Sequence, residues 1–172
     1  MTMTADATAS PSLPRWLRIA LLIVALIETL SALSDLPAIF YDYGHTAPML
    51  IFAQALTKAK LALAPLFAGA ALWFMIKAKP RNAIVALAAL ALLRWIAELP
   101  SIALHGLELS ASFSGLFMFA VWFVYPALGI AALWLALRNR RLVLAGLLVM
   151  LPTLAALLSV AAFAIGVMRY GF

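Results

Sequence analysis

Five long apolar runs make up most of the chain, and short segments rich in charge, proline or glycine separate them. A helix needs about 20 predominantly apolar residues to cross the hydrocarbon core of a bilayer, so each run is long enough for one span. Hydrophobic residues account for 67% of the 172 positions and charged residues for 10%. A soluble domain of this length could not bury that much apolar surface. The sequence therefore predicts an all-α integral membrane protein.

We expect the five transmembrane helices at about residues 16–34, 49–76, 83–99, 113–137 and 142–167. Residues 1–14 are mostly small and polar, so we expect them to form a disordered N-terminal tail. Residues 15–172 are expected to form a single transmembrane helical domain. Pro100 predicts that the third helix ends at Leu99, because the residue before a proline is biased away from the helical conformation. The loop that follows would contain His105.

Basic residues cluster beside the ends of these runs, and they alternate with loops that carry acidic residues and both histidines. The basic positions are Arg15 and Arg18, then Lys77, Lys79 and Arg81, then Arg138, Arg140 and Arg141. The positive-inside rule places such clusters in the cytoplasm, so we expect the N-terminus inside and the C-terminus outside a bacterial inner (plasma) membrane. The net charge of +6 is therefore interpreted as a topology signal and not as a nucleic-acid-binding surface.

An internal repeat is also indicated. Pro65, the motif Ala70-Ala71-Leu72-Trp73 and Lys77 recur 61 residues later as Pro126, Ala131-Ala132-Leu133-Trp134 and Arg138. This spacing predicts a tandem two-helix repeat plus a fifth helix, with a pseudo-two-fold axis along the membrane normal. The alternative is a chance alignment of helices rich in leucine and alanine.

The charges inside the apolar runs are not duplicated with this pattern. At the offset of 63 residues that relates Asp35-Leu36-Pro37 to Glu98-Leu99-Pro100, Glu28 corresponds to Ala91 and Arg94 corresponds to Ser31. A structural requirement of the hairpin should appear in both copies. The single occurrence of the charges therefore favours a functional role.

Each charge within a bilayer costs about 2.5 kcal/mol or more, so it needs a partner or an aqueous cavity. Arg94 and Glu98 are four residues apart and share a helix face, whereas Lys58 and Lys60 point in different directions. We expect a polar pocket in the outer half of the bilayer, walled by the first three helices. The candidate ligand- or ion-binding residues are Glu28, Lys58, Arg94 and Glu98, with Lys60, Gln54, Asp35 and Tyr125 as secondary candidates.

Two interpretations of this cluster stay open. In the functional one, Glu28 exchanges protons while Arg94 and Lys58 hold an anion or a lipid phosphate. In the structural one, the ion pairs Glu28–Lys58 and Arg94–Glu98 only fix the register of the helices.

Other chemistry has little support in the sequence. The absence of cysteine excludes disulfides and thiolate sites, and no motif of a serine nucleophile or a phosphate-binding loop is found. His45 and His105 fall in equivalent loops and are weak candidates for zinc or copper ligands, without the close spacing that such sites favour. No cofactor is expected, and a non-enzymatic role is favoured.

Three hypotheses about function follow. The first is a membrane protein that binds or translocates a small solute, a lipid headgroup or a proton through the polar cluster. The second is a non-catalytic auxiliary subunit of a larger membrane complex, and the third is a metal-dependent membrane enzyme. The expected partners are the lipid bilayer, a small-molecule or lipid ligand, and another membrane protein or a second copy of the chain, with no nucleic acid.

Overall fold

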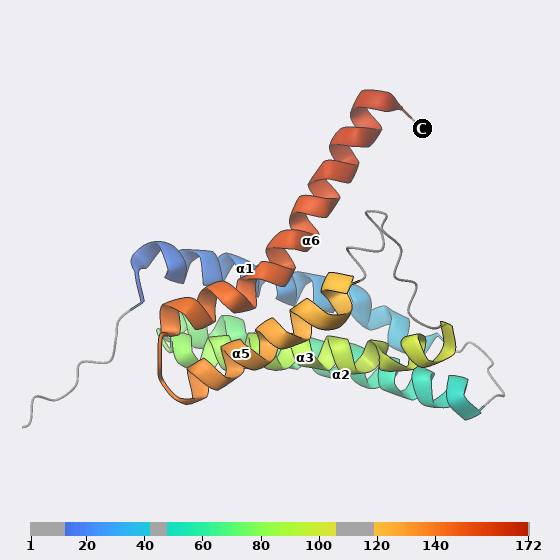
Figure 1. Cartoon of the computed structure of the whole chain (residues 1–172), viewed down its shortest axis with the longest axis horizontal. Helices are drawn as coiled ribbons and strands as arrows, with labels where there is room; N and C mark the ends of the chain where they lie inside the picture. Colours follow the sequence, from blue (N-terminus) through green and yellow to red (C-terminus); the bar gives the residue numbers. More distant parts are fainter. Residues whose placement is uncertain (1–12, 42–47, 106–118, 172) are drawn as a thin grey trace, which may run out of the picture.

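The structure is a computed structural model that describes residues 13–41, 48–105 and 119–171 (Figure 1). Its helices are α1 (Arg15–Asp35), α2 (Pro48–Ile76), α3 (Pro80–His105), α5 (Tyr125–Leu137) and α6 (Leu142–Tyr170), with a 3-10 helix η1 (Leu36–Phe40) and a π-helix η2 (Ala120–Val124). No strand occurs in these three ranges.

Within the described ranges, five helical segments are long and apolar enough to cross a membrane. They are Arg15–Phe40, Pro48–Ile76, Pro80–Pro100, Ala120–Leu137 and Leu142–Arg169. The predictions of an all-helical integral membrane protein and of five spanning helices are therefore confirmed. The first six residues of the fourth expected span, and most of the N-terminal tail, lie outside the described residues.

The prediction that the third helix ends at Leu99 is wrong. Helix α3 continues through Pro100 to His105, so the loop expected from residue 100 begins later. Proline removes only one helical N–H donor, and apolar helices packed against neighbours tolerate this loss. The similar tripeptide Asp35-Leu36-Pro37 does not continue a helix in this way. Helix α1 ends at Asp35, and Leu36 and Pro37 begin the 3-10 helix η1.

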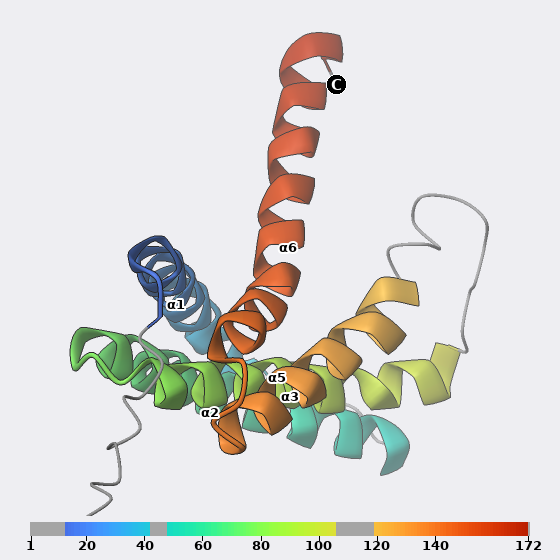
Figure 2. The same cartoon turned by 60° about the vertical axis from the view of Figure 1, so that its left-hand side comes forward.

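Helices α1, α2 and α3 lie side by side, and α5 packs on α3 and α6 (Figure 1). The first half of α6 contacts the bundle, whereas its second half projects away from the other helices in both views (Figure 2). This departure leaves the large apolar side chains Leu158, Phe163 and Met168 more than two-thirds exposed.

A tightly packed core lies where the first turns of α1, α3 and α6 meet. Leu17, Leu21 and Ile84 are fully buried there. A Cβ atom at Gly146 of α6 would lie 3.4 Å from Leu17 Cδ2 and from Leu21 Cδ1, which is already van der Waals contact. The missing side chain of Gly146 thus allows α6 to approach α1 closely.

Helices α2 and α5 end with the same main-chain arrangement. Ala78 and Asn139 adopt positive φ angles of 54° and 52°, and the N–H groups of Lys79 and Arg140 donate to the carbonyls of Phe74 and Leu135 at 2.8 and 3.0 Å. This is the Schellman motif, which satisfies carbonyls at a helix C-terminus. In both places a cation also lies over a tryptophan ring, at 4.7 Å for Lys77 over Trp73 and 4.4 Å for Arg138 over Trp134.

Arg81 joins the start of α3 to the end of α5. Its Nε donates to the carbonyl of Ala136 at 2.9 Å and its Nη2 to the carbonyl of Leu137 at 2.7 Å. These are terminal carbonyls of α5, where the helix dipole favours a cation. The guanidinium therefore stabilises that helix end and fixes its position against α3.

Candidate functional site

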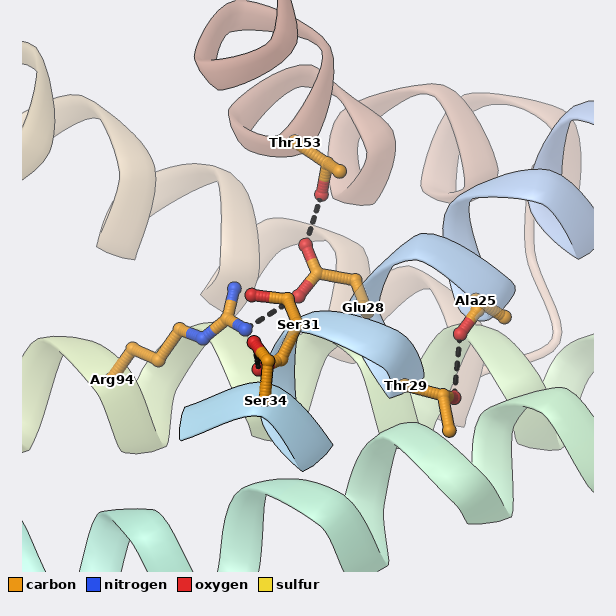
Figure 3. A network of polar contacts seen from close by, with 7 residues as sticks. All are labelled: Ala25, Glu28, Thr29, Ser31, Ser34, Arg94 and Thr153. Carbon is orange, nitrogen blue, oxygen red and sulfur yellow. Dashed lines mark hydrogen bonds and ion pairs between the residues drawn. The ribbon is translucent and has the colours of Figure 1, made fainter. Parts of the chain in front are cut away.

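Glu28 is the charged side chain that α1 presents to its neighbours, and it is only 6% exposed. Arg94 Nη2 of α3 lies 2.6 Å from Glu28 Oε2, and Thr153 Oγ1 of α6 donates to Glu28 Oε1 at 2.6 Å. Figure 3 shows Arg94 and Thr153 approaching the carboxylate from two different helices. Three helices that are distant in sequence therefore meet at one carboxylate.

The contact between Arg94 and Glu28 is an ion pair in which the N–H group is not aligned with Oε2. As a result Glu28 Oε2 has no aligned hydrogen-bond donor within the described part of the chain. A buried carboxylate needs both a counter-charge and hydrogen bonds to offset the loss of water. Arg94 supplies the charge, and Oε2 retains the capacity to accept a hydrogen bond.

These residues border a cavity of about 370 Å³ between α1, α3, η2, α5 and α6. Its walls are mainly apolar, and its polar lining includes Glu28, Ser31, Arg94 and Glu98. Pockets of this size, with apolar walls and a few placed polar groups, are typical small-molecule sites. The described residues thus form a site suited to an amphipathic molecule.

One wall of the cavity depends on a proline. In an α-helix the carbonyl of Trp122 would accept from the amide of residue 126, but Pro126 has no N–H. The indole N–H of Trp95, on α3, donates to this carbonyl at 3.1 Å instead. Trp95 also lines the cavity, so one side chain both shapes the wall and holds η2 against α3. A π-helix, as in η2, occurs frequently at functional sites.

A second ion pair lies beside the first. Lys60 Nζ of α2 is 3.1 Å from Glu98 Oε1 of α3, with 23% and 46% of the two side chains exposed. Glu98 also lines the cavity, one helical turn from Arg94. Charges of alternating sign therefore run from Glu28 through Arg94 and Glu98 to Lys60.

The structure brings together some of the candidate residues and separates others. Glu28, Arg94, Glu98 and Tyr125 line the cavity, whereas Lys58, Gln54 and Asp35 do not. The expected ion pairs Glu28–Lys58 and Arg94–Glu98 are not those observed, because Arg94 reaches Glu28 and Glu98 binds Lys60. Of the two lysines on α2, Lys60 pairs with a carboxylate of the cluster, whereas Lys58 does not line the cavity, so the preference for Lys58 over Lys60 is wrong.

The walls also differ from the expectation of three N-terminal helices. No residue of α2 lines the cavity within the described chain, and α5, η2 and α6 complete it. Sequence reasoning missed Trp95 and Thr153. A polar residue next to Pro152 in an otherwise apolar run was the available indication of Thr153.

The candidate metal ligands lie at the margins of the structure. His45 falls outside the described residues, and only the backbone of His105 is described, at the end of α3. Among described side chains, no group of three or more histidine, cysteine, aspartate or glutamate residues could hold a metal ion.

The fold and the cavity define a small, all-helical integral membrane protein with a polar network at the edge of an apolar pocket. No family model, no curated protein and no solved structure matches the chain. A proposal about function therefore has to be argued from the chemistry of the cavity.

Proposed function

We propose that the protein binds a small amphipathic molecule in the cavity, with an anionic group of the ligand at Arg94 and an apolar part against the walls. The observation that carries the proposal is the network of Glu28, Arg94 and Thr153 beside an apolar cavity of about 370 Å³. Arg94 is held in place by Glu28, and 39% of its side chain is exposed. Its remaining N–H groups are suited to a carboxylate or phosphate.

We further propose that this site lies in the outer half of a bacterial inner membrane. The proposal rests on the basic clusters at Arg15, Lys77 and Arg138, which favour a cytoplasmic N-terminus and an external C-terminus. Glu28 lies seven residues before the end of α1 at Asp35, or about 10 Å along the helix axis from the outer end.

Packing favours binding over passage through the protein. Leu17, Leu21 and Ile84 are fully buried in the half of the bundle between the cavity and the basic ends. Gly146 brings α6 into contact with Leu17 and Leu21 in the same region. A solute in the cavity would therefore meet close-packed side chains toward the cytoplasm, where interiors contain few voids larger than a water molecule.

A tandem arrangement of the two hairpins is part of the proposal. It is supported by the equivalent helix ends at Ala78 and Asn139, which lie 61 residues apart like the sequence motifs before them. The charged cluster would then be an addition to one copy of a duplicated scaffold.

Native mass spectrometry of protein extracted in mild detergent tests the binding proposal. We expect a bound mass on the wild type that is lost in Arg94→Ala and reduced in Glu28→Gln. Lys58→Ala is the matched control, because Lys58 is a half-buried cation that does not line the cavity. Size-exclusion chromatography checks that all variants are monodisperse. The same bound mass on wild type and Arg94→Ala would refute the proposal.

A role as auxiliary subunit is the second candidate, and the second half of α6 favours it. This segment leaves the bundle (Figure 2). Its side chains Leu158, Phe163 and Met168 are 71%, 68% and 86% exposed. A partner helix could cover this surface. Co-purification of another membrane protein at fixed stoichiometry would support this role, and an isolated monomer or homodimer would contradict it.

A further inference from the structure

We infer that the ligand is a zwitterionic phospholipid of the ethanolamine type, with its phosphate at Arg94, its ammonium at Glu98 and an acyl chain in the cavity. This inference rests on the proposed function and specifies the class of ligand. It is argued from four features of the site: the N–H groups of Arg94 beyond its contact with Glu28, the oxygen of Glu98 that accepts from no donor in the described chain, the balance of charge and the lateral opening.

Arg94 provides the anion subsite. A guanidinium carries five N–H donors, and the contact with Glu28 is made through Nη2. The ion pair fixes one edge of the guanidinium and leaves the others available to the cavity that Arg94 lines. A phosphate offers several acceptor oxygens and suits the forked geometry of arginine.

Glu98 provides the ammonium subsite. Lys60 contacts Oε1, and within the described chain no donor is assigned to Oε2. Glu98 lies one helical turn from Arg94 on the same face, which places the two side chains about 5–6 Å apart at their Cβ atoms. A phosphate and an ammonium joined by a two-carbon linker can span such a distance. A primary ammonium also has N–H donors for the carboxylate, which a quaternary ammonium lacks.

The balance of charge favours a zwitterion over an anion. Glu28, Glu98, Arg94 and Lys60 form two carboxylate–cation pairs, so the fixed charge of the group is zero. A ligand with net negative charge would leave an uncompensated charge in surroundings of low dielectric constant, where such a charge is costly. A zwitterion keeps the site neutral.

The cavity also has an apolar end and a lateral opening. Leu87 lies seven residues before Arg94 on α3, about 10 Å deeper along the helix, and it lines the cavity with Val149. Leu157 and Val160 of α6 line it too, yet they are 41% and 66% exposed, because α6 turns away from the bundle (Figure 2). An acyl chain can therefore enter between α6 and the bundle from the lipid side.

Delipidated protein in detergent, titrated with phospholipids of one acyl composition and measured by native mass spectrometry, tests the inference. We expect phosphatidylethanolamine to bind about tenfold or more tightly than phosphatidylglycerol or phosphatidylcholine, the value of one charge-assisted hydrogen bond. Glu98→Gln should remove this preference without weakening phosphatidylglycerol. Arg94→Gln should weaken all three lipids. Lys58→Gln, outside the cavity, is the matched control and should keep the wild-type preference.

A second titration with water-soluble glycerophosphoethanolamine separates the headgroup from the acyl chain. Binding at least about tenfold weaker than that of the lipid supports an acyl chain in the cavity, and equal binding overturns it. Preference for phosphatidylglycerol, equal binding of phosphatidylcholine, or an unchanged preference in Glu98→Gln overturns the zwitterion assignment. In those cases, loss of binding of all three lipids in Arg94→Gln would still support ligand binding at Arg94. Failure of the zwitterion assignment can therefore be distinguished from failure of the proposed function.

Discussion

Trp95 donates its indole N–H to the main-chain carbonyl of Trp122, 3.1 Å away, at the position where Pro126 cannot supply an amide. The bond joins α3 to η2 and lies beside the cavity. A side chain from one helix thus donates to a carbonyl that Pro126 leaves without its α-helical amide, so we expect Trp95 and Pro126 to be coupled energetically.

Trp95→Phe should destabilise the protein by about 1–3 kcal/mol, because the carbonyl of the buried Trp122 loses its donor. In a Pro126→Ala background the same substitution should cost less, since an alanine at this position restores an amide for that carbonyl. A double-mutant cycle from denaturant unfolding in detergent measures this coupling. An equal cost of Trp95→Phe in both backgrounds would contradict this explanation.

Arg94→Ala should destabilise the fold by about 2–3 kcal/mol, toward the lower end for a broken buried pair because Arg94 is 39% exposed. Glu28→Gln should cost about 1 kcal/mol or less, since the amide oxygen can still accept from Thr153. Unfolding in detergent compares the two. If Glu28→Gln proves the more damaging, the buried carboxylate is not what Arg94 stabilises. The double variant should be more stable than Arg94→Ala alone.

Lys60→Gln should change the free energy of unfolding by at most about 1 kcal/mol, because the Lys60–Glu98 pair is partly exposed. The contrast with Arg94→Ala is the informative quantity, and both variants are measured in one detergent at one salt concentration. A loss as large as that of Arg94→Ala would show that the second pair is also a structural requirement.

Gly146→Ala should be nearly neutral, because its Cβ would meet Leu17 and Leu21 at the ordinary contact distance of 3.4 Å. Gly146→Leu should destabilise the protein by about 1–3 kcal/mol or more through overpacking between α1 and α6. Gly166→Leu is the control, since nothing lies within 4 Å of its Cβ position. Thermal unfolding in detergent separates the three variants, and a stable Gly146→Leu would place the close approach elsewhere.

Ala78→Gly should stabilise the protein by about 1 kcal/mol, because alanine at a φ of 54° is in the left-handed region that glycine adopts without strain. Asn139→Gly at the equivalent helix end should stabilise the protein less, since asparagine tolerates the left-handed conformation better than alanine does. Melting temperatures of the two variants make a paired comparison. A larger gain at residue 139 would contradict the assignment of strain to Ala78.

The number of spanning helices was predictable because bilayer thickness sets the length of each apolar run. The end of α3 was not, since the effect of Pro100 depends on what surrounds it in the folded state. The partners of the site residues also depend on their surroundings in the folded state. Helical periodicity places Arg94 and Glu98 on one face, but it does not reveal which helix faces them.

Interhelical partners depend on packing that the sequence shows only indirectly. Gly146 permits α6 to approach α1, which brings Thr153 to Glu28, whereas Lys58 on α2 stays away from the cavity. A repeat-based or periodicity-based argument assigns residues to faces. Choosing between Lys58 and Arg94 as the partner of Glu28 required the distances between helices.

The two hydrogen bonds of Arg81 have a consequence for the order of assembly. Arg81 precedes the carbonyls that it binds by 55 and 56 residues, so it leaves the ribosome well before α5 is complete. We therefore expect the guanidinium at the start of α3 to lack these two acceptors until α5 has been inserted and docks onto it. The helical hairpin α2–α3 would act as the template onto which α5 docks, and α6 would then complete the bundle.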